Sequence, residues 1–212
     1  NAKQILQLGN HPVLLCDDMV YQIVGEKFND YLTRYGFHVL HVAFNGEASD
    51  AEIDRVVALA EKDGADLVIG LGGGKTIDSA KAIADILGRP VVIAPTIAST
   101  DAPTSALSVI YTEDGAFEKY IFYSKNPELV LVDTKVIAGA PKRLLASGIA
   151  DGLATWVEAR AVMQANGETV LGQRQTLAGA AIAQKCEETL FADGLQALAA
   201  CEAQVVTPAL EH

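Results

Sequence analysis

The sequence predicts an α/β protein in which a doubly wound, mostly parallel sheet is followed by part of an all-helical second domain. Over the first 140 positions, short apolar segments alternate with helical segments of about a dozen residues. The third apolar segment ends in three consecutive glycines, as strands before ligand-binding turns do. From residue 142 onward the chain is rich in Ala, Leu and Glu and has no strand pattern.

The first elements follow from the spacing of apolar residues. We expect strands at residues 12–16, 37–44 and 66–71, and helices at 20–31 and 53–60. Gly36 ends the first of these helices, and Ser49 with Glu52 forms a capping box ahead of the second.

The remaining elements complete both predicted domains. We expect a helix at 76–87, strands at 90–94 and 129–132, and between these strands a loop at 95–106 and two β segments, 107–111 and 120–123. Helices are expected within 142–162 and 173–203. The predicted division is therefore an α/β domain at 1–140 and the start of a helical domain at 141–212.

Composition excludes several classes of protein. The net charge of -11, with no cluster of basic residues, disfavours binding to nucleic acid. Three cysteines without paired spacing predict free thiols and a reducing compartment. No apolar run has the length of a membrane span and no leader pattern opens the chain, so we expect no membrane partner and a cytoplasmic location.

The turn Gly72–Gly74 is a candidate phosphate site. Residues without Cβ let a pyrophosphate approach the backbone N–H groups, and Lys75 and Thr76 add a cation and a hydroxyl. A P-loop does not fit, because Ile69 stands where its first glycine is needed, and a G-x-G-x-x-G fingerprint starting at Gly70 ends on Lys75. A nucleotide is favoured, and a turn without any ligand remains the alternative.

Three motifs carry a resemblance to a known family. GGGKTIDSAK at residues 72–81 resembles the nucleotide loop of the iron-containing alcohol dehydrogenase superfamily. APTIASTDAPTSALSVIY at 94–111 and GIADGLATW at 148–156, followed by EAR at 158–160, resemble the members that oxidise glycerol. The resemblance implies that residues 1–140 form the NAD-binding domain and that 141–212 begin a helical metal and substrate domain, whose divalent metal is usually zinc.

The resemblance also implies roles for particular residues in the oxidation of glycerol to dihydroxyacetone. Asp101 would meet the substrate, Asp151 would bind the metal, and both would act in catalysis. The residues expected to bind NAD are Asp17, Gly72, Gly73, Gly74, Lys75, Thr96, Ser99, Ser105, Leu107 and Tyr111. The family's two histidine ligands fall beyond His212, so we expect these 212 residues to be incomplete for catalysis, and the full-length protein to form homo-oligomers.

The expected NAD and substrate residues each have a structural alternative. Asp17 follows the first strand, where it would accept hydrogen bonds from the adenosine ribose, but either Asp17 or Asp18 would also suit a helix N-cap. Asp101 would accept hydrogen bonds from polyol hydroxyls, or it would form an Asx turn before Pro103. For Thr96 and the two serines, loop chemistry alone is the alternative.

Asp151 lies in an almost wholly apolar or small segment, which favours a role as a metal ligand. The alternatives are a helix N-cap or a buried salt bridge to Arg143 or Arg160. The histidines His11, His38 and His41 lack ligand spacing with Asp151, so we expect them in packing. The Ala-rich segment after Thr176 is expected to be ordinary helix core.

Two competing functions remain. A related enzyme could use NAD and metal on a phosphorylated substrate, but residues 94–123 contain no Arg and only Lys119 as a cation. A non-catalytic NAD-binding module is the other alternative.

Overall fold

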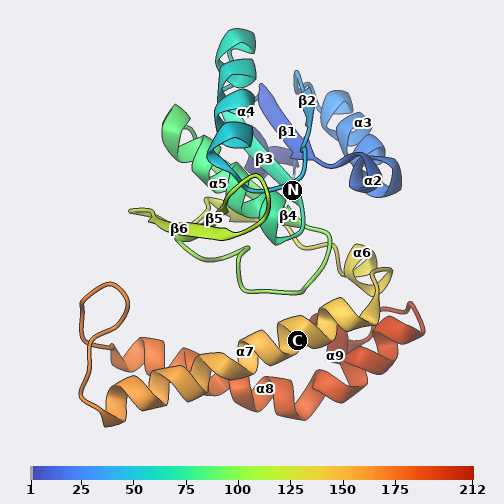
Figure 1. Ribbon diagram of the computed structural model, residues 1–212. Coiled ribbons are helices and arrows are strands. Elements are labelled where there is room, and N and C mark those ends of the chain that lie inside the picture. Colours follow the sequence, from blue (N-terminus) through green and yellow to red (C-terminus); the bar gives the residue numbers. More distant parts are fainter. Residues whose placement is uncertain (1) are drawn as a thin grey trace. The chain divides into compact units, whose positions relative to one another are not determined.

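The computed structural model describes residues 2–212 and confirms the α/β class (Figure 1). All strands of the main sheet are parallel, and their order is β2-β1-β3-β4-β7. The strands are β1 (Pro12–Cys16), β2 (Leu40–Ala43), β3 (Leu67–Gly72), β4 (Val91–Pro95) and β7 (Leu129–Val130). Because β1 lies inside the sheet, the chain runs outward from it in both directions.

Helices cover both faces of this sheet, which confirms the doubly wound prediction. Val13 and Leu15 of β1 pack with α4 (Asp50–Asp63) and α5 (Gly74–Leu87). Leu14 and Cys16 point to the other face, where α1 (Ala2–Leu6) and α3 (Glu26–Arg34) cover them. The alternation along a strand therefore supplies two separate cores.

A two-stranded antiparallel hairpin packs beside α5. It consists of β5 (Leu107–Tyr111) and β6 (Phe117–Phe122). Its turn places Gly115 at φ +85, a backbone conformation that favours glycine. The backbone N–H of Tyr111 donates to the carbonyl of Ala48 at 2.9 Å, which joins the hairpin to the segment before α4.

Several predicted boundaries differ from the structure. The strand expected from residue 37 begins at Leu40, because the N–H of His38 donates to the carbonyl of Asn10 outside the sheet. The helix expected from Val20 is α2 (Asp18–Val20) followed by a π-helical turn, Tyr21–Gly25. The β segment expected at 120–123 begins instead at Phe117.

The capping box before α4 is only half formed. Ser49 is the N-cap and accepts from the N–H of Glu52 at 3.3 Å. The Glu52 carboxylate does not return to Ser49, because it accepts from the N–H of Asn45 at 2.8 Å and pairs with Arg55 at 2.7 Å.

The second unit is helical. It contains α6 (Thr134–Ala138), α7 (Lys142–Gln164), α8 (Leu177–Glu202) and α9 (Pro208–Glu211), together with the segment Ile97–Asp101 from the loop after β4. The predicted division at residue 140 falls after α6, whereas the compact units divide before it, because α6 packs against α8 and α9.

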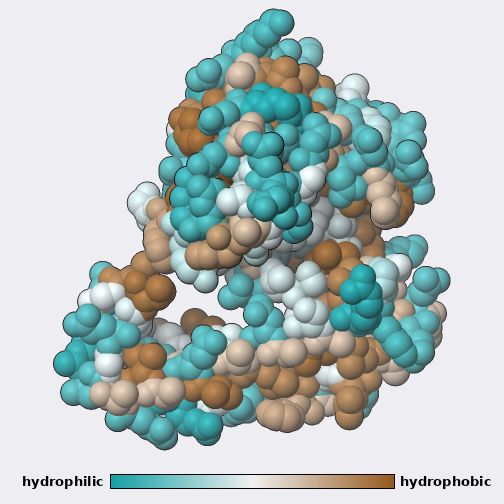
Figure 2. Space-filling model, in the orientation of Figure 1, coloured by the Kyte–Doolittle hydropathy of each residue, from teal (hydrophilic) through white to brown (hydrophobic). Residues whose placement is uncertain are grey.

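The long helices bury small residues and expose large apolar ones. On α8, Ala183 and Ala197 are buried, as the expected helix core requires, whereas Leu177 is 88% and Leu195 is 83% exposed. Figure 2 shows apolar side chains along the surface of this helical unit. None of the helices within residues 2–212 combines the length and the apolar character of a membrane span. All three cysteines are free, as predicted.

Candidate functional site

Three segments predicted to contact NAD follow neighbouring strands at one edge of the sheet. Asp17 follows β1, the glycine turn follows β3 and Thr96 follows β4. The N–H of Thr96 donates to the carbonyl of Gly72 at 3.0 Å, which extends the pairing of β3 and β4 past the strand ends. Since neighbouring strands lie about 4.8 Å apart, these groups form a row that an extended ligand can follow.

The glycine turn opens α5. Gly73 is the N-cap in an extended conformation, and no side chain caps the helix. The free N–H groups of the first turn and the helix dipole favour an anion at this position. Gly72 also has a packing role, because a Cβ there would lie 2.8 Å from Thr76 Oγ1. Thr76 is buried against the turn, so its hydroxyl contributes to packing as well.

Lys75, the expected phosphate cation, already has partners within the α/β unit. Its Nζ lies 2.5 Å from Glu47 Oε1 and 6.0 Å from the centre of the Tyr111 ring. Lys75 is exposed and Glu47 is half-buried, so a ligand phosphate would have to replace Glu47 as the partner of Lys75. Its role in NAD binding, like that of Tyr111, stays a prediction.

Asp17 caps the helix that follows β1. Its Oδ1 accepts from the N–H of Val20 at 2.8 Å, which confirms the N-cap alternative and assigns the cap to Asp17 rather than Asp18. A carboxylate accepts several hydrogen bonds, so this cap leaves acceptor capacity for a ribose hydroxyl. The ribose role remains a prediction.

The remaining predicted NAD residues divide between the two units. Thr96 is buried, and Ser105 and Leu107 are half-buried, in the α/β unit. Ser99 is half-buried in the segment Ile97–Asp101, which belongs to the helical unit.

Within the helical unit, the structure brings the predicted substrate residue and the predicted metal ligand together. The backbone N–H of Asp101 donates to Asp151 Oδ2 at 3.0 Å. Asp151 is exposed in the middle of α7, whose N-cap is Pro141. Both structural alternatives for Asp151, an N-cap and a buried salt bridge, are therefore wrong. An acid that looks misplaced among small residues lies on an exposed part of the helix, beside the predicted substrate residue Asp101.

The segment that carries Asp101 lies very close to α7. A Cβ on Gly148 would lie 2.2 Å from the carbonyl oxygen of Ala98. Gly148 thus permits a backbone approach that a larger residue would block.

Gly148→Ala is expected to destabilise the helical unit by about 1 to 3 kcal/mol, because the new methyl group must displace the backbone at Ala98. Gly194→Ala on α8 is the matched control, since a Cβ there meets Ile149 only at 3.6 Å and alanine favours helix. Thermal unfolding of both variants measures the difference. Equal stability of the two would contradict the close approach.

The histidines take part in packing, as expected. His11 Nε2 lies 2.7 Å from Asp63 Oδ2, and the rings of His11 and His38 meet edge to face. His41 stacks on Tyr21 with ring centres 3.8 Å apart, and burial lowers the pKa of its imidazole. Among the residues that the structure describes, no three His, Cys, Asp or Glu side chains gather as metal ligands would.

The sequence prediction missed a buried ion pair on α5. Lys81 Nζ lies 2.9 Å from Asp78 Oδ1, and both residues are more than nine-tenths buried. The signal was present, because Asp78 and Lys81 are three residues apart in a helix of mostly small and apolar residues, where buried charges require partners.

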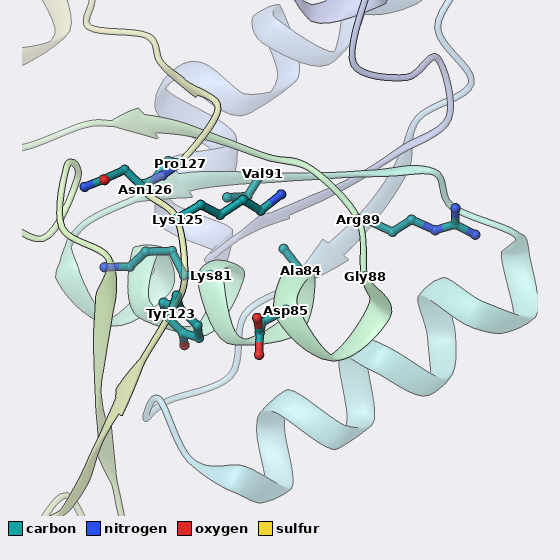
Figure 3. Close-up of a pocket in the computed structure, with 10 residues that line it drawn as sticks. All are labelled: Lys81, Ala84, Asp85, Gly88, Arg89, Val91, Tyr123, Lys125, Asn126 and Pro127. Carbon is teal, nitrogen blue, oxygen red and sulfur yellow. The ribbon is translucent and has the colours of Figure 1, made fainter.

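A cavity of about 130 Å³ lies beside this ion pair, and Lys81 is one of the residues that line it (Figure 3). Gly88 and Arg89 at the end of α5, Val91 at the start of β4, and Tyr123 line part of it. It therefore opens near the amino ends of the strands and contains none of the predicted site residues. Figure 3 shows that the Lys81, Asp85 and Arg89 side chains point in different directions.

The fold and the glycine turn define a doubly wound α/β protein with a candidate anion site at the carboxyl edge of its sheet. Residues 1–134 match the family model of iron-containing alcohol dehydrogenases, and the chain belongs to this family.

Its relatives include proteins named for small hydroxylated compounds. The chain is 55% identical to a glycerol dehydrogenase of Escherichia coli O6:H1, over 90% of this chain and 54% of that protein. It is 48% identical to a glycolaldehyde reductase of Halobacterium salinarum, over 96% of this chain and 56% of that protein. The crystal structure of glycerol dehydrogenase from Schizosaccharomyces pombe matches with a TM-score of 0.91 and 43% identity. The match covers 98% of this chain and 52% of that chain. The chain thus spans about half the length of these relatives.

Proposed function

We propose that this chain carries the NAD-binding part of a metal-dependent polyol dehydrogenase that oxidises glycerol to dihydroxyacetone. The observation that carries the proposal is the row of Asp17, the glycine turn and Thr96 at the carboxyl edge of the sheet. A dinucleotide has the same order of parts: a ribose that needs acceptors, a pyrophosphate that needs N–H donors, and a second nucleoside.

The substrate proposal rests on Asp101 and on the charges around it. A carboxylate accepts hydrogen bonds from polyol hydroxyls, whereas a phosphorylated substrate requires cations. The only basic residue in 94–123, Lys119, lies 2.5 Å from Asp50 and is already paired. The names of the two relatives, glycerol dehydrogenase and glycolaldehyde reductase, also indicate small uncharged compounds.

Asp151 fits the role of a metal ligand. Its carboxylate is exposed, and one oxygen accepts the Asp101 N–H, which orients the group in the way that outer hydrogen bonds orient metal ligands. Zinc is proposed from the resemblance to glycerol-oxidising members, and carboxylates also bind iron. When bound, such a metal would supply Lewis-acid chemistry that lowers the pKa of the substrate hydroxyl, and NAD would accept the hydride. The protein's residues hold the two reactants in position.

The test is reduction of NAD with glycerol, with and without a chelator, on the longest polypeptide that carries this sequence. We expect turnover that the chelator abolishes and that added zinc or iron restores, with the more effective metal identifying the natural one. Turnover only with a phosphorylated alcohol would favour the competing enzyme, and NAD binding without any turnover would favour a binding module.

Apolar exposure supports the proposal that the full-length protein forms homo-oligomers. Leu177, Ile182, Phe191 and Leu195 of α8 are each more than two-thirds exposed. Monomeric proteins rarely leave such a surface in water, so further chain or another copy is expected to cover it.

NAD is expected to bind more tightly than NADP, because Asp17 would face the additional 2′-phosphate. Like charges about 4 Å apart cost about 1 to 4 kcal/mol, depending on how much water screens them. Titration of wild type and Asp17→Gly with both cofactors measures the difference in affinity between NAD and NADP. This difference should be smaller in the variant. If wild type binds both cofactors equally, Asp17 does not contact the ribose. The helix start must be checked by circular dichroism, since Asp17 also caps α2.

A further inference from the structure

Lys81 holds the chain segment that leads into β5. Besides its ion pair with Asp78, its ammonium donates to the carbonyl of Ala102 at 2.9 Å, to the Ser105 hydroxyl at 3.2 Å and to the carbonyl of Leu107. The Lys81 side chain is only 2% exposed. A buried ammonium is costly unless acceptors surround it, so the fold of residues 102–107 and the burial of Lys81 depend on each other.

Asp78 extends the same network to the strand itself. Its Oδ2 accepts from the N–H of Val109 at 3.2 Å, and its backbone carbonyl accepts from the Ser108 hydroxyl at 2.8 Å. The Tyr123 hydroxyl in turn donates to Ser108 Oγ at 2.9 Å, and burial raises the pKa of Tyr123 to about 12, so it stays a donor. One face of α5 therefore fixes the hairpin and the segment before it.

We propose that Lys81 is a positioning residue for the nicotinamide half of NAD, an inference that rests on the proposed function. Along the sheet edge, Asp17 marks the adenosine end and the glycine turn marks the pyrophosphate. The loop after β4 is next in the row, so it faces the second nucleoside. Ser105 in this loop and Leu107 at the start of β5, both predicted NAD contacts, are held directly by Lys81.

Lys81 itself does not touch the ligand. All of its donors are used within the protein, and its side chain is closed off from solvent. Loss of Lys81 should therefore weaken the binding of only that part of the ligand that residues 102–107 contact. ADP contains the adenosine and pyrophosphate parts of NAD but lacks the nicotinamide nucleoside, so the ratio of the two affinities isolates this effect.

The experiment measures dissociation constants of NAD and ADP for wild type, Lys81→Met and the double variant Asp78→Asn with Lys81→Met. The double variant removes both buried charges, so that neither is left unpaired. We expect NAD to bind at least about 10-fold more weakly to both variants, the loss that follows from a disrupted charged hydrogen bond, while ADP changes less than about 2-fold. Amide hydrogen exchange should accelerate in residues 102–107 and 107–111 but not in β1.

Lys119→Met is the matched control, because Lys119 also pairs with an aspartate, Asp50, but at an exposed position on β6. For this variant, the ratio of the dissociation constants of NAD and ADP should equal that of wild type. Equal losses of NAD and ADP in the double variant, or no loss of NAD, would overturn the positioning role. If wild type binds ADP and NAD equally weakly, at millimolar levels or above, the proposed function itself fails and the inference falls with it.

Discussion

Asp101→Ala is expected to lower kcat/KM for glycerol about 10- to 150-fold, the effect of losing a hydrogen bond to a charged group, in the longest polypeptide that carries this sequence. The substitution is selective for a structural reason. The link between the two predicted site residues uses the backbone N–H of Asp101, which alanine retains, so Asp151 keeps its hydrogen bond. The dissociation constant of NAD should change less than about 2-fold.

Asp101→Asn separates the effect of the negative charge of Asp101 from the effect of its side-chain size in the same assay. Asparagine keeps the size of the side chain and one acceptor oxygen but adds N–H donors, so we expect a loss between those of wild type and alanine. A comparable loss of NAD affinity in either variant would show that Asp101 shapes its loop, the Asx-turn alternative, and does not contact the substrate.

The position of the glycine turn could be predicted from sequence because its determinants are local. An apolar segment followed by three glycines and a helical segment defines a strand, a turn and a helix N-terminus within about twenty residues. The structure agrees to within one or two residues, since β3 ends at Gly72 and α5 begins at Gly74. Parallel order then follows, because right-handed crossovers leave few arrangements for such alternating elements.

The groups that hold the loops could not be predicted, because their partners are distant in sequence. Asp101 and Asp151 are separated by 50 positions, and Lys81 contacts a carbonyl 26 positions away. Every residue has a backbone carbonyl, so the sequence does not indicate which carbonyls accept these hydrogen bonds. A helical motif containing Asp78 and Lys81 therefore looked like part of a nucleotide loop, although its side chains point toward the protein interior.

The exposure of Asp151 could not be predicted either, because it depends on which side of α7 is covered by other elements. The small neighbours of Asp151 suggested a buried acid, yet α7 has no buried residue among those described. Small residues in a long helix permit close approach as well as burial, as Gly148 shows by its contact distance to Ala98. The apolar pattern gives the period of the helix but not which parts of its surface are covered.

The 212 residues alone are expected to retain no stoichiometric zinc or iron after dialysis and to leave glycerol unoxidised. A catalytic zinc normally has three protein ligands, and within residues 2–212 only Asp151 is placed for this role, with no group of three candidate ligands. A single exposed carboxylate binds a divalent ion weakly. NAD binding should persist, since every predicted NAD residue precedes residue 134.

Metal analysis and a glycerol assay on this span, beside the longest polypeptide that carries it, test the expectation. In the longer polypeptide, Asp151→Ala should lose both metal and turnover, while Glu158→Ala, an exposed acid on the same helix, should lose neither. Stoichiometric metal in the short span would contradict the assignment of a single ligand here. Variants of His11, His38 and His41 would then show which side chains supply the others.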